Sequence, residues 1–418
     1  MPSFRTSPGM RDVLMPDSAR FRHFTATFAE VVEAAGYGQV IPPLLEDVGV
    51  FARIGDATDV VTKEMYDFVD KGERHVALRP EQTASVCRAF VQHRPTTPWK
   101  AWYSGPNFRY EKPQRGRFRQ FEQVGIEVLG VDDPHLDAEV VALGWEFFSR
   151  LGLRGVELVL NSLGEPDDRA RYVEALRAYF ESNSADLSAA GRETLLRNPL
   201  RVLDSKRPDD AAVVAAAPRI TGFWSDAAAD HFATVRRALD DIGVPYRLEP
   251  LLVRGLDYYR RTTFEFQAAS LESAQNAIGG GGRYDGLVAD LGGPPTPGIG
   301  FALGVDRTLI ASDDEDVFPA PETMVDAFVL DTTGGEHAHA ITTELRRAGV
   351  RVDRAFEGRS MKSQMKSADR SGAHVAVIVG ADEAAAGTAV VRPLRAELDQ
   401  ITVARADLVA TVQKAIVT

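Results

Sequence analysis

The segment Asn107–Glu127 constrains the fold of this chain more than any other part of the sequence. Alternate side chains of a β-strand lie on the same face of a sheet. In the second half of the segment, one set of alternate positions is polar, aromatic or small: Arg117, Arg119, Phe121, Gln123, Gly125 and Glu127. The other set is apolar: Val124, Ile126 and Val128. The pattern predicts a strand that packs one face on a core and lines a site with the other. An exposed, salt-bridged strand is the alternative.

The same segment gathers positive charge in an acidic protein. Its basic residues are Arg109, Lys112, Arg115, Arg117 and Arg119, whereas the chain of 418 residues has a formal net charge of −12. A local group of cations against this background predicts an anion-binding site. The acidic balance argues against a general polyanion binder, but it is compatible with a nucleic acid held by local basic patches.

Length and composition limit the class of protein. A chain of 418 residues predicts two or three domains. No apolar stretch approaches the roughly 18 residues that cross a bilayer, and the first residues lack the apolar core of a signal peptide. The single cysteine, Cys87, excludes an internal disulfide, and no spacing of histidine with cysteine indicates structural zinc. These features predict a protein of the reducing cytoplasm with no membrane span.

The order of predicted elements indicates an α+β protein. Asp17 or Ser18 is expected to cap a helix whose apolar positions lie three or four residues apart: Phe21, Phe24, Phe28 and Val31. Residues 165–245 are rich in Ala, Arg, Asp and Glu and hold few strand signals, which predicts a helical insertion. After residue 324, strands alternate with helices, which predicts a small C-terminal α/β domain.

Several peptides of the chain resemble known motifs. Residues 107–129 resemble motif 2 of the class II aminoacyl-tRNA synthetases, residues 17–43 resemble motif 1, and residues 298–312 resemble motif 3. Residues 252–259 and 281–286 resemble the two signature peptides of the histidyl-tRNA synthetase family, bacterial type. The resemblance covers nearly the whole chain, with the motifs in the family's order.

The resemblance implies an architecture. Residues 1–318 are expected to form a class II catalytic domain, with an antiparallel sheet flanked by helices and interrupted by the insertion at 165–245. Residues 324–418 are expected to form an anticodon-binding α/β domain. The glycines at 279–282 do not have the spacing of a phosphate-binding loop, so close backbone approach or a sheet bulge explains them better.

The family's reaction has two steps. Histidine and ATP form histidyl-adenylate and pyrophosphate, and histidine then moves to the 3′ end of histidine tRNA. The first step mainly requires that the reactants be aligned and that negative charge on the phosphates be stabilised. Arginine suits this role because its guanidinium group can donate two hydrogen bonds to phosphate oxygens. The resemblance implies that Arg109 and Arg254 are catalytic at the α-phosphate. It assigns the rest of the ATP site to Glu111, Arg117, Phe121 and Arg307. Magnesium is expected with ATP, but no ligand cluster in the sequence identifies its site.

The histidine site is also implied by the resemblance. Glu81, Thr83 and Gln123 correspond to residues that receive the α-amino group. Glu127 and Tyr259 correspond to the pair that binds the imidazole, and Tyr258 and Tyr284 to residues that line the pocket. A carboxylate and a phenol at the two ends of an imidazole reject isosteres without nitrogen by about 10⁴-fold, because buried polar groups would lose their partners. Core aromatics with satisfied hydroxyls are the alternative for Tyr258 and Tyr284.

The remaining expectations concern partners. The resemblance implies that Lys112, Gln114 and Arg115 meet the acceptor end of the tRNA. Basic residues spaced three or four apart suggest an anticodon-binding helical face, although a solvated face is the alternative: Arg359, Lys362, Lys366 and Arg370. A homodimer is expected through motif 1, with Pro42 near the symmetry axis.

Two other interpretations compete with a synthetase for histidine. A paralogue that regulates the first enzyme of histidine biosynthesis, or the synthetase-like domain of a kinase, predicts missing arginines or a missing C-terminal domain. Arg109, Arg254, Arg307 and residues 324–418 are all present. A synthetase for another amino acid fits less well, because Glu127 and the Tyr258–Tyr259 peptide suit an imidazole.

Overall fold

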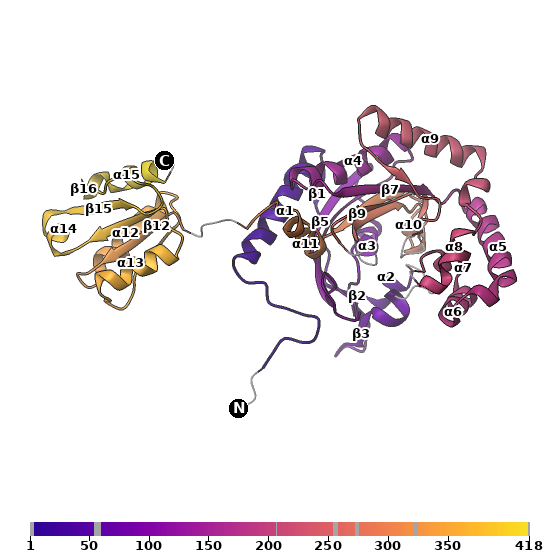
Figure 1. The fold of residues 1–418 in the computed structure, drawn as a ribbon, viewed down its shortest axis with the longest axis horizontal. Helices are drawn as coiled ribbons and strands as arrows, with labels where there is room; N and C mark the ends of the chain where they lie inside the picture. Colours follow the sequence, from indigo (N-terminus) through magenta and orange to yellow (C-terminus); the bar gives the residue numbers. More distant parts are fainter. Residues whose placement is uncertain are drawn as a thin grey trace. The chain divides into compact units, whose positions relative to one another are not determined.

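The structure is a computed structural model that divides the chain into two compact units, Met1–Pro319 and Ala320–Thr418 (Figure 1). It describes residues 4–53, 60–205, 207–253, 258–271, 276–320 and 325–416.

An eight-stranded sheet organises the first unit. Its order is β1 (Gly38–Gln39), β5 (Trp99–Phe108), β6 (Gln120–Leu129), β11 (Gly298–Gly304), β10 (Ala277–Arg283), β9 (Arg260–Ala268), β7 (Val156–Ser162) and β8 (Arg247–Leu248). The central strands from β5 to β7 are antiparallel, and only the short edge strands β1 and β8 pair in parallel. A smaller sheet joins β2 (Leu45–Asp47), β4 (His75–Leu78) and β3 (Tyr66–Val69).

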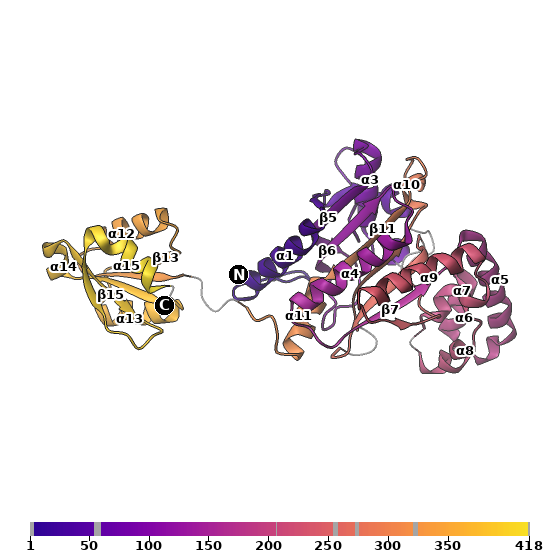
Figure 2. The same cartoon turned by 90° about the horizontal axis from the view of Figure 1, so that it is seen from above.

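Helices cover both faces of the large sheet. On one face, α1 (Asp17–Ala34) and α4 (Pro134–Arg150) pack on the apolar positions of β6, namely Val124, Ile126 and Val128 (Figure 2). On the other, α3 (Thr83–His93) and α10 (Leu287–Asp290) share a second cluster with Tyr258, Tyr259 and Tyr284. This second cluster therefore lies on the face to which the polar positions of β6 point. The α+β class and the split of β6 into two faces are confirmed.

The start of α1 differs from the expectation. Pro16, rather than Asp17 or Ser18, is the residue before the helix, and no side chain caps it. The predicted cap is therefore wrong. Asp17 is already helical, and its carboxylate lies at the positive end of the helix dipole, where a negative charge is favourable. The helix ends before Gly36, whose φ of +84° a residue with a Cβ rarely adopts.

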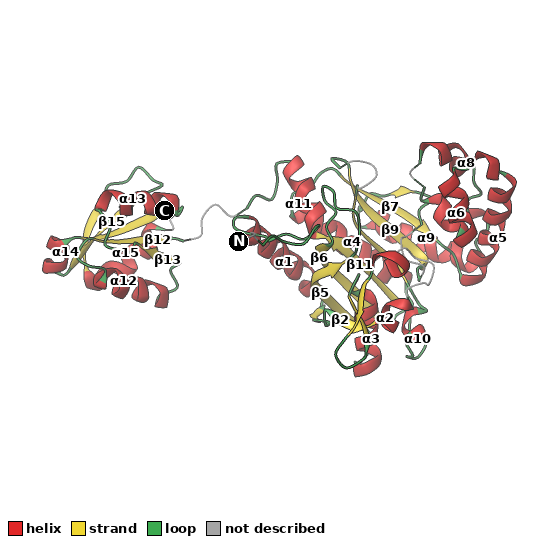
Figure 3. Ribbon diagram, turned by 90° about the horizontal axis from the view of Figure 1, so that it is seen from below, coloured by secondary structure: helices red, strands yellow, loops and turns green. Residues whose placement is uncertain are grey.

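The segment predicted as a helical insertion contains helices in two groups. Four helices bury a core of their own: α5 (Pro166–Ser182), α6 (Ala189–Arg197), α7 (Pro199–Leu203) and α8 (Ala211–Ala215). The fifth, α9 (Asp226–Asp241), buries Phe232, Val235 and Leu239 in the main core beside α4. Figure 3 shows α5, α6 and α8 grouped together, with α9 running back toward the strands.

The second unit is an α/β sandwich. Its sheet has the order β13 (Val352–Arg354), β12 (Ala327–Asp331), β14 (Val375–Val379), β15 (Thr388–Pro393) and β16 (Ile401–Ala404), with β13, β12 and β14 parallel. Helices α12 (Glu336–Arg347) and α15 (Leu408–Ala415) cover one face, and α13 (Met361–Arg370) covers the other. A short helix, α14 (Ala381–Ala386), leads into β15. In the described parts of both units, no helix is long and apolar enough to span a membrane.

Candidate active site

A cavity opens on the large sheet of the first unit, on the side opposite α1 and α4. Strand β6 contributes Phe121 and Gln123, and α11 (Val305–Asp314) contributes Arg307 near its first turn. The loop before β6 contributes Arg109 and Arg117. Residues far apart in the sequence therefore meet in one place, and the three described arginines that were predicted for the ATP site, Arg109, Arg117 and Arg307, share it.

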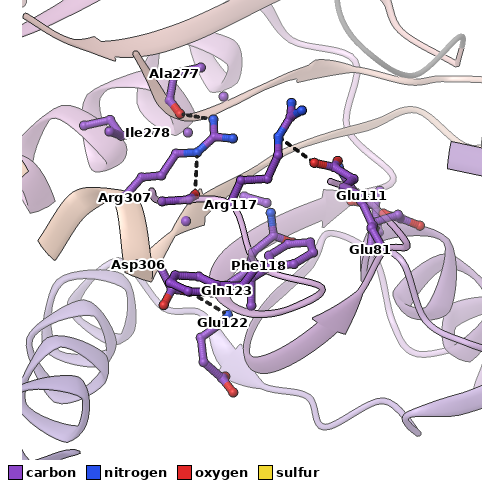
Figure 4. Close-up of a pocket in the computed structure, with 18 of the residues that line it drawn as sticks. Glu81, Glu111, Arg117, Phe118, Glu122, Gln123, Ala277, Ile278, Asp306 and Arg307 are labelled. Carbon is purple, nitrogen blue, oxygen red and sulfur yellow. Dashed lines mark hydrogen bonds and ion pairs between the residues drawn. The ribbon is translucent and has the colours of Figure 1, made fainter. Parts of the chain in front are cut away.

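Positive charge is concentrated at one end of this cavity (Figure 4). Arg307 donates Nε to the carbonyl of Gly116 (3.0 Å) and Nη1 to that of Ala277 (3.0 Å). Burial lowers the pKa of Arg307, and the charges of Arg117 and Arg109 lower it further. Arg117 forms an ion pair with Glu111 (2.5 Å), which offsets part of the repulsion. A group of cations that repel one another in a partly buried space is stabilised when an anion enters it.

Arg109 is oriented by a hydrogen bond and by an aromatic ring. Its Nε donates to the carbonyl of Pro80 (2.9 Å), and its guanidinium carbon lies 5.3 Å from the centre of the Phe121 ring. The bond to Pro80 ties it to the turn that carries Glu81. That carboxylate caps α3 by accepting the backbone N–H groups of Thr83 (2.6 Å) and Ala84 (2.8 Å). One turn therefore positions residues of both predicted subsites, Arg109 for the nucleotide and Glu81 for the amino acid.

Glu127 is the centre of a buried hydroxyl network. Its Oε1 accepts hydrogen bonds from Thr83 Oγ1 (2.7 Å) and Tyr103 OH (3.1 Å), and its Oε2 accepts one from Tyr284 OH. Glu127 is 1% exposed. Burial raises its pKa to about 8, although the hydrogen bonds from the three hydroxyls act to lower the pKa. Among the described residues, Thr83, Tyr258 and Tyr259 line the cavity, and Glu127 lies behind them.

Glycines in neighbouring strands make room for this network. A Cβ on Gly300 would lie 1.9 Å from Glu127 Oε2, and one on Gly298 would lie 2.4 Å from Cε2 of Tyr284. A Cβ on Gly125 would lie 2.4 Å from the Tyr103 hydroxyl. The polyglycine tract is likewise part of β10, where a Cβ on Gly281 would lie 2.0 Å from the carbonyl oxygen of Gly300. Close backbone approach, rather than a phosphate loop, is confirmed for this tract.

The remaining predicted residues fall into three groups. Glu111 and Gln123 line the cavity, and Gln123 accepts a hydrogen bond from Asn107 Nδ2 (2.8 Å). Arg254 lies outside the described residues. The candidates for tRNA contact are all exposed: Lys112, Gln114, Arg115, Arg359, Lys362, Lys366 and Arg370.

Two details of the prediction are wrong. Arg119 does not share the cavity face of β6, because the strand begins at Gln120 and the alternation does not extend to it. Its guanidinium lies 3.7 Å from the ring centre of Tyr110 instead. Arg359 does not share a helical face with Lys362 and Lys366, because α13 begins at Met361.

Two residues that the sequence analysis missed support the site. Tyr103 donates a hydrogen bond to Glu127, and the pairing of β5 with β6 places Tyr103 directly opposite Gly125. An aromatic residue opposite a glycine is the feature of the sequence that could have identified Tyr103. Arg79 is 2% exposed and donates to the carbonyls of Pro106 (2.9 Å) and Pro42 (2.8 Å). It therefore ties the turn before Glu81 to the motif 1 segment, and no periodicity reveals this.

Replacing Tyr103 with phenylalanine is expected to weaken the network without destroying it, because Thr83 still donates to the same oxygen of Glu127. We expect about 1 kcal/mol lower stability, and a KM raised about threefold to tenfold for histidine, the substrate that the sequence resemblance implies. Thermal unfolding and steady-state kinetics measure the two effects. Tyr172→Phe is the matched control, because the Tyr172 hydroxyl donates to the carbonyl of Pro218 (3.0 Å), away from the cavity. An equal rise of KM in both variants would contradict the assignment.

No metal centre is evident in the described parts of the chain, where no group of three or more His, Cys, Asp and Glu side chains is placed to hold a metal ion. Carboxylates near the cationic end of the cavity include Glu111, which pairs with Arg117, and Asp306, which accepts a hydrogen bond from Arg11 (2.6 Å).

Comparisons with known proteins cover nearly the whole chain. The family model described as histidyl-tRNA synthetase matches residues 9–308, and the one described as anticodon binding domain matches residues 324–415. The histidine–tRNA ligase of Nocardia farcinica is 48% identical over 384 residues, which is 90% of each protein. That of Corynebacterium kroppenstedtii is 46% identical over 402 residues, 94% of this chain and 92% of the relative.

Solved structures agree. Apo histidyl-tRNA synthetase of Staphylococcus aureus superposes with a TM-score of 0.82 at 33% identity, and the match covers 98% of this chain and 100% of that one. A Bacillus halodurans protein described as an ATP phosphoribosyltransferase regulatory subunit/histidyl-tRNA synthetase has a TM-score of 0.65 at 20% identity over 88% of this chain and 97% of that one, which shows the fold alone.

Proposed function

The chain belongs to the histidyl-tRNA synthetase family, and we propose that the cavity on its large sheet is where histidine and ATP react. Its activity is that of a histidine–tRNA ligase, an ATP-dependent aminoacyl-tRNA synthetase. The regulatory-paralogue interpretation is not favoured, because relatives named as ligases match over the full length and the C-terminal unit is present.

The cationic end of the cavity suits the triphosphate. In the first step a carboxylate oxygen of histidine bonds to the α-phosphorus of ATP, the bond to the bridging oxygen breaks, and pyrophosphate leaves. Arg109 is proposed to contact the α-phosphate, and Arg254 to contact it from another side. Arg307 is proposed to hold the γ-phosphate side and stack on adenine, with Phe121 on the other face of the base. The observation that carries this proposal is that Arg109, Arg117 and Arg307 line one cavity.

Glu111 and Arg117 are proposed to complete the nucleotide site. Their ion pair orients Arg117 toward this site. Magnesium is proposed to accompany ATP, since the metal neutralises charge on the leaving phosphates in this chemistry.

The other end of the cavity suits histidine. Glu81, Thr83 and Gln123 are proposed to receive the amino group. Glu127 and Tyr259 are proposed to bind the two nitrogens of the imidazole, with Tyr258 and Tyr284 as walls. The burial of Glu127 and its three hydroxyl donors support this, because an acceptor fixed by donors on several elements is already oriented before the ligand arrives.

The second step needs the tRNA near the same cavity. The 3′-hydroxyl of the terminal ribose attacks the carbonyl carbon of histidyl-adenylate, and AMP leaves with the electron pair of the broken bond. Lys112, Gln114 and Arg115 are proposed to meet the acceptor end, and their exposure at the tip of the loop supports this. The C-terminal unit, residues 324–418, is proposed to bind the anticodon through Arg359, Lys362 and Lys366.

Two proposals concern the whole protein. A homodimer through motif 1 is supported by the apolar residues exposed beside Pro42, namely Ile41, Leu44 and Leu45. A reducing cytoplasmic location is supported by the single buried cysteine, Cys87.

ATP–pyrophosphate exchange with single amino acids tests the proposed function. We expect exchange with histidine and none above background with the other amino acids, because only an imidazole satisfies Glu127 and Tyr259 together. Exchange with a different amino acid would make the pocket assignment wrong, and no exchange with any amino acid would support the regulatory interpretation.

A further inference from the structure

The loop between β13 and α13 in the C-terminal unit holds an aromatic ring at the surface. Phe356 is 56% exposed, and the guanidinium carbon of Arg354 lies 4.6 Å from the centre of its ring. A single exposed apolar side chain is ordinary. This one is covered in part by a cation, and it borders a hollow lined also by Asp353, Glu357 and Arg359.

The loop that carries Phe356 is held at both ends. Ala355 donates its backbone N–H to the carbonyl of Val329 (2.9 Å), which ties the loop to β12. Gln364 is 1% exposed, and its Nε2 donates to the carbonyls of Arg359 (2.7 Å) and Asp331 (2.8 Å). A buried amide thus fixes the end of the loop against the sheet, so the ring stands on a preformed platform.

The turn beside the ring is strained. Glu357 has φ of +68°, in the left-handed region that a residue with a Cβ seldom adopts. Such a conformation is unfavourable and persists only where surrounding structure imposes it, often at ligand sites. The next residue, Gly358, also has positive φ (+54°), so the chain turns sharply and Arg359 returns to the hollow.

The charges of the hollow favour a nucleobase over a bare phosphate. Arg354 and Arg359 supply cations, and Lys362 and Lys366 continue the basic surface along α13. Asp353 and Glu357 supply carboxylates, and Glu357 pairs with Arg359 (2.6 Å). Carboxylates repel phosphate, but they accept hydrogen bonds from the N–H groups on base edges. Aromatic rings and guanidinium planes are the surfaces on which unpaired RNA bases stack.

We propose that this hollow binds one unpaired base of the tRNA anticodon loop, stacked on Phe356, with the carboxylates of Asp353 and Glu357 facing the base edge. The inference rests on the proposed anticodon binding by this unit and names the subsite within it. Arg354 lies against the Phe356 ring and, like it, borders the hollow, while Arg359, Lys362 and Lys366 attract the backbone of the loop.

Fluorescence of a labelled RNA tests the stacking. An anticodon stem-loop of histidine tRNA is synthesised with 2-aminopurine at one unpaired position at a time and added to the full-length protein. We expect fluorescence quenching at one position with the wild type and with Phe356→Trp, and loss of that quenching with Phe356→Leu. Leu398→Ala changes another side chain of the same unit, which is 57% exposed, and is expected to behave as wild type.

Kinetics separate this inference from the proposed function. Phe356→Leu is expected to raise the KM for tRNA about tenfold in aminoacylation, since base stacking is worth about 1–3 kcal/mol. ATP–pyrophosphate exchange, which needs no tRNA, is expected to stay at the wild-type rate.

If the wild type charges histidine tRNA while Phe356→Leu keeps both the wild-type KM for tRNA and the wild-type quenching, the stacking site is wrong and the proposed function stands. If the wild type fails to charge histidine tRNA, the proposed function itself is wrong. Equal binding of an RNA duplex without a loop would show a phosphate-binding surface and would also overturn the stacking site.

Discussion

Replacing Arg307 with alanine is expected to slow histidine-dependent ATP–pyrophosphate exchange by about 10²–10³-fold. The Arg307 guanidinium is fixed by the carbonyls of Gly116 and Ala277, so it needs no reorganisation to meet the triphosphate that we propose binds there. If this cavity is the phosphate site, loss of one preorganised and partly buried charge removes stabilisation from the place where charge develops on the leaving group. Initial rates of exchange at saturating ATP and histidine measure the effect.

Two controls define what this result means. Arg307→Lys keeps the charge but has a single nitrogen in place of the fork, so we expect an intermediate rate. Arg115→Ala removes an arginine whose side chain is 68% exposed and which pairs with Asp314 (2.9 Å), and exchange should remain at the wild-type rate. If Arg307→Ala exchanges at a rate near wild type, the cationic cluster does not serve the triphosphate.

The sequence predicted the site where the chemistry leaves a local pattern. The apolar positions of β6 identified its core face, and the polar positions identified Phe121, Gln123 and Glu127 on the other. The pattern failed at Arg119, because alternation applies only while the chain is extended, and the strand begins one residue later. The same limit applies to Arg359, which precedes its helix.

Contacts between segments that lie far apart in the sequence could not be predicted from the sequence pattern. Tyr103 reaches Glu127 because β5 and β6 pair in one particular register, and nothing local to either residue fixes that register. Arg79 joins three segments through carbonyl groups, which carry no residue-specific signal. The division of the insertion, with α9 in the main core, depends on tertiary packing that its helical periodicity does not encode.

Replacing Glu127 with glutamine is expected to lower kcat/KM for histidine in exchange by about 10³-fold, and to narrow the preference for histidine over other amino acids. Glutamine keeps the volume but cannot ionise, so it cannot supply the negative charge that Glu127 is proposed to present to the imidazole N–H after losing its proton. Its amide also brings two donors to a place where Thr83, Tyr103 and Tyr284 already donate. Exchange rates with histidine and with each competing amino acid measure both effects, and unchanged selectivity would count against Glu127 as the imidazole partner.

The same variant has a signature in stability. The pKa of Glu127 is raised from an ordinary value of 4.5 to about 8. Between these values the folded protein holds a proton that the unfolded chain has released, so the stability due to this group is complete below pH 4.5 and is lost as the pH rises through about 8. Glu127→Gln does not titrate, so its melting temperature should fall less than that of the wild type between pH 5 and 9. Glu146→Gln, on the exposed surface of α4, should follow the wild-type profile because its side chain is 51% exposed. Parallel profiles for wild type and Glu127→Gln would mean that the Glu127 carboxyl is already ionised in the folded protein. In that case the three hydroxyl donors would fully offset the cost of burying its charge, and the anionic acceptor for histidine would be preformed.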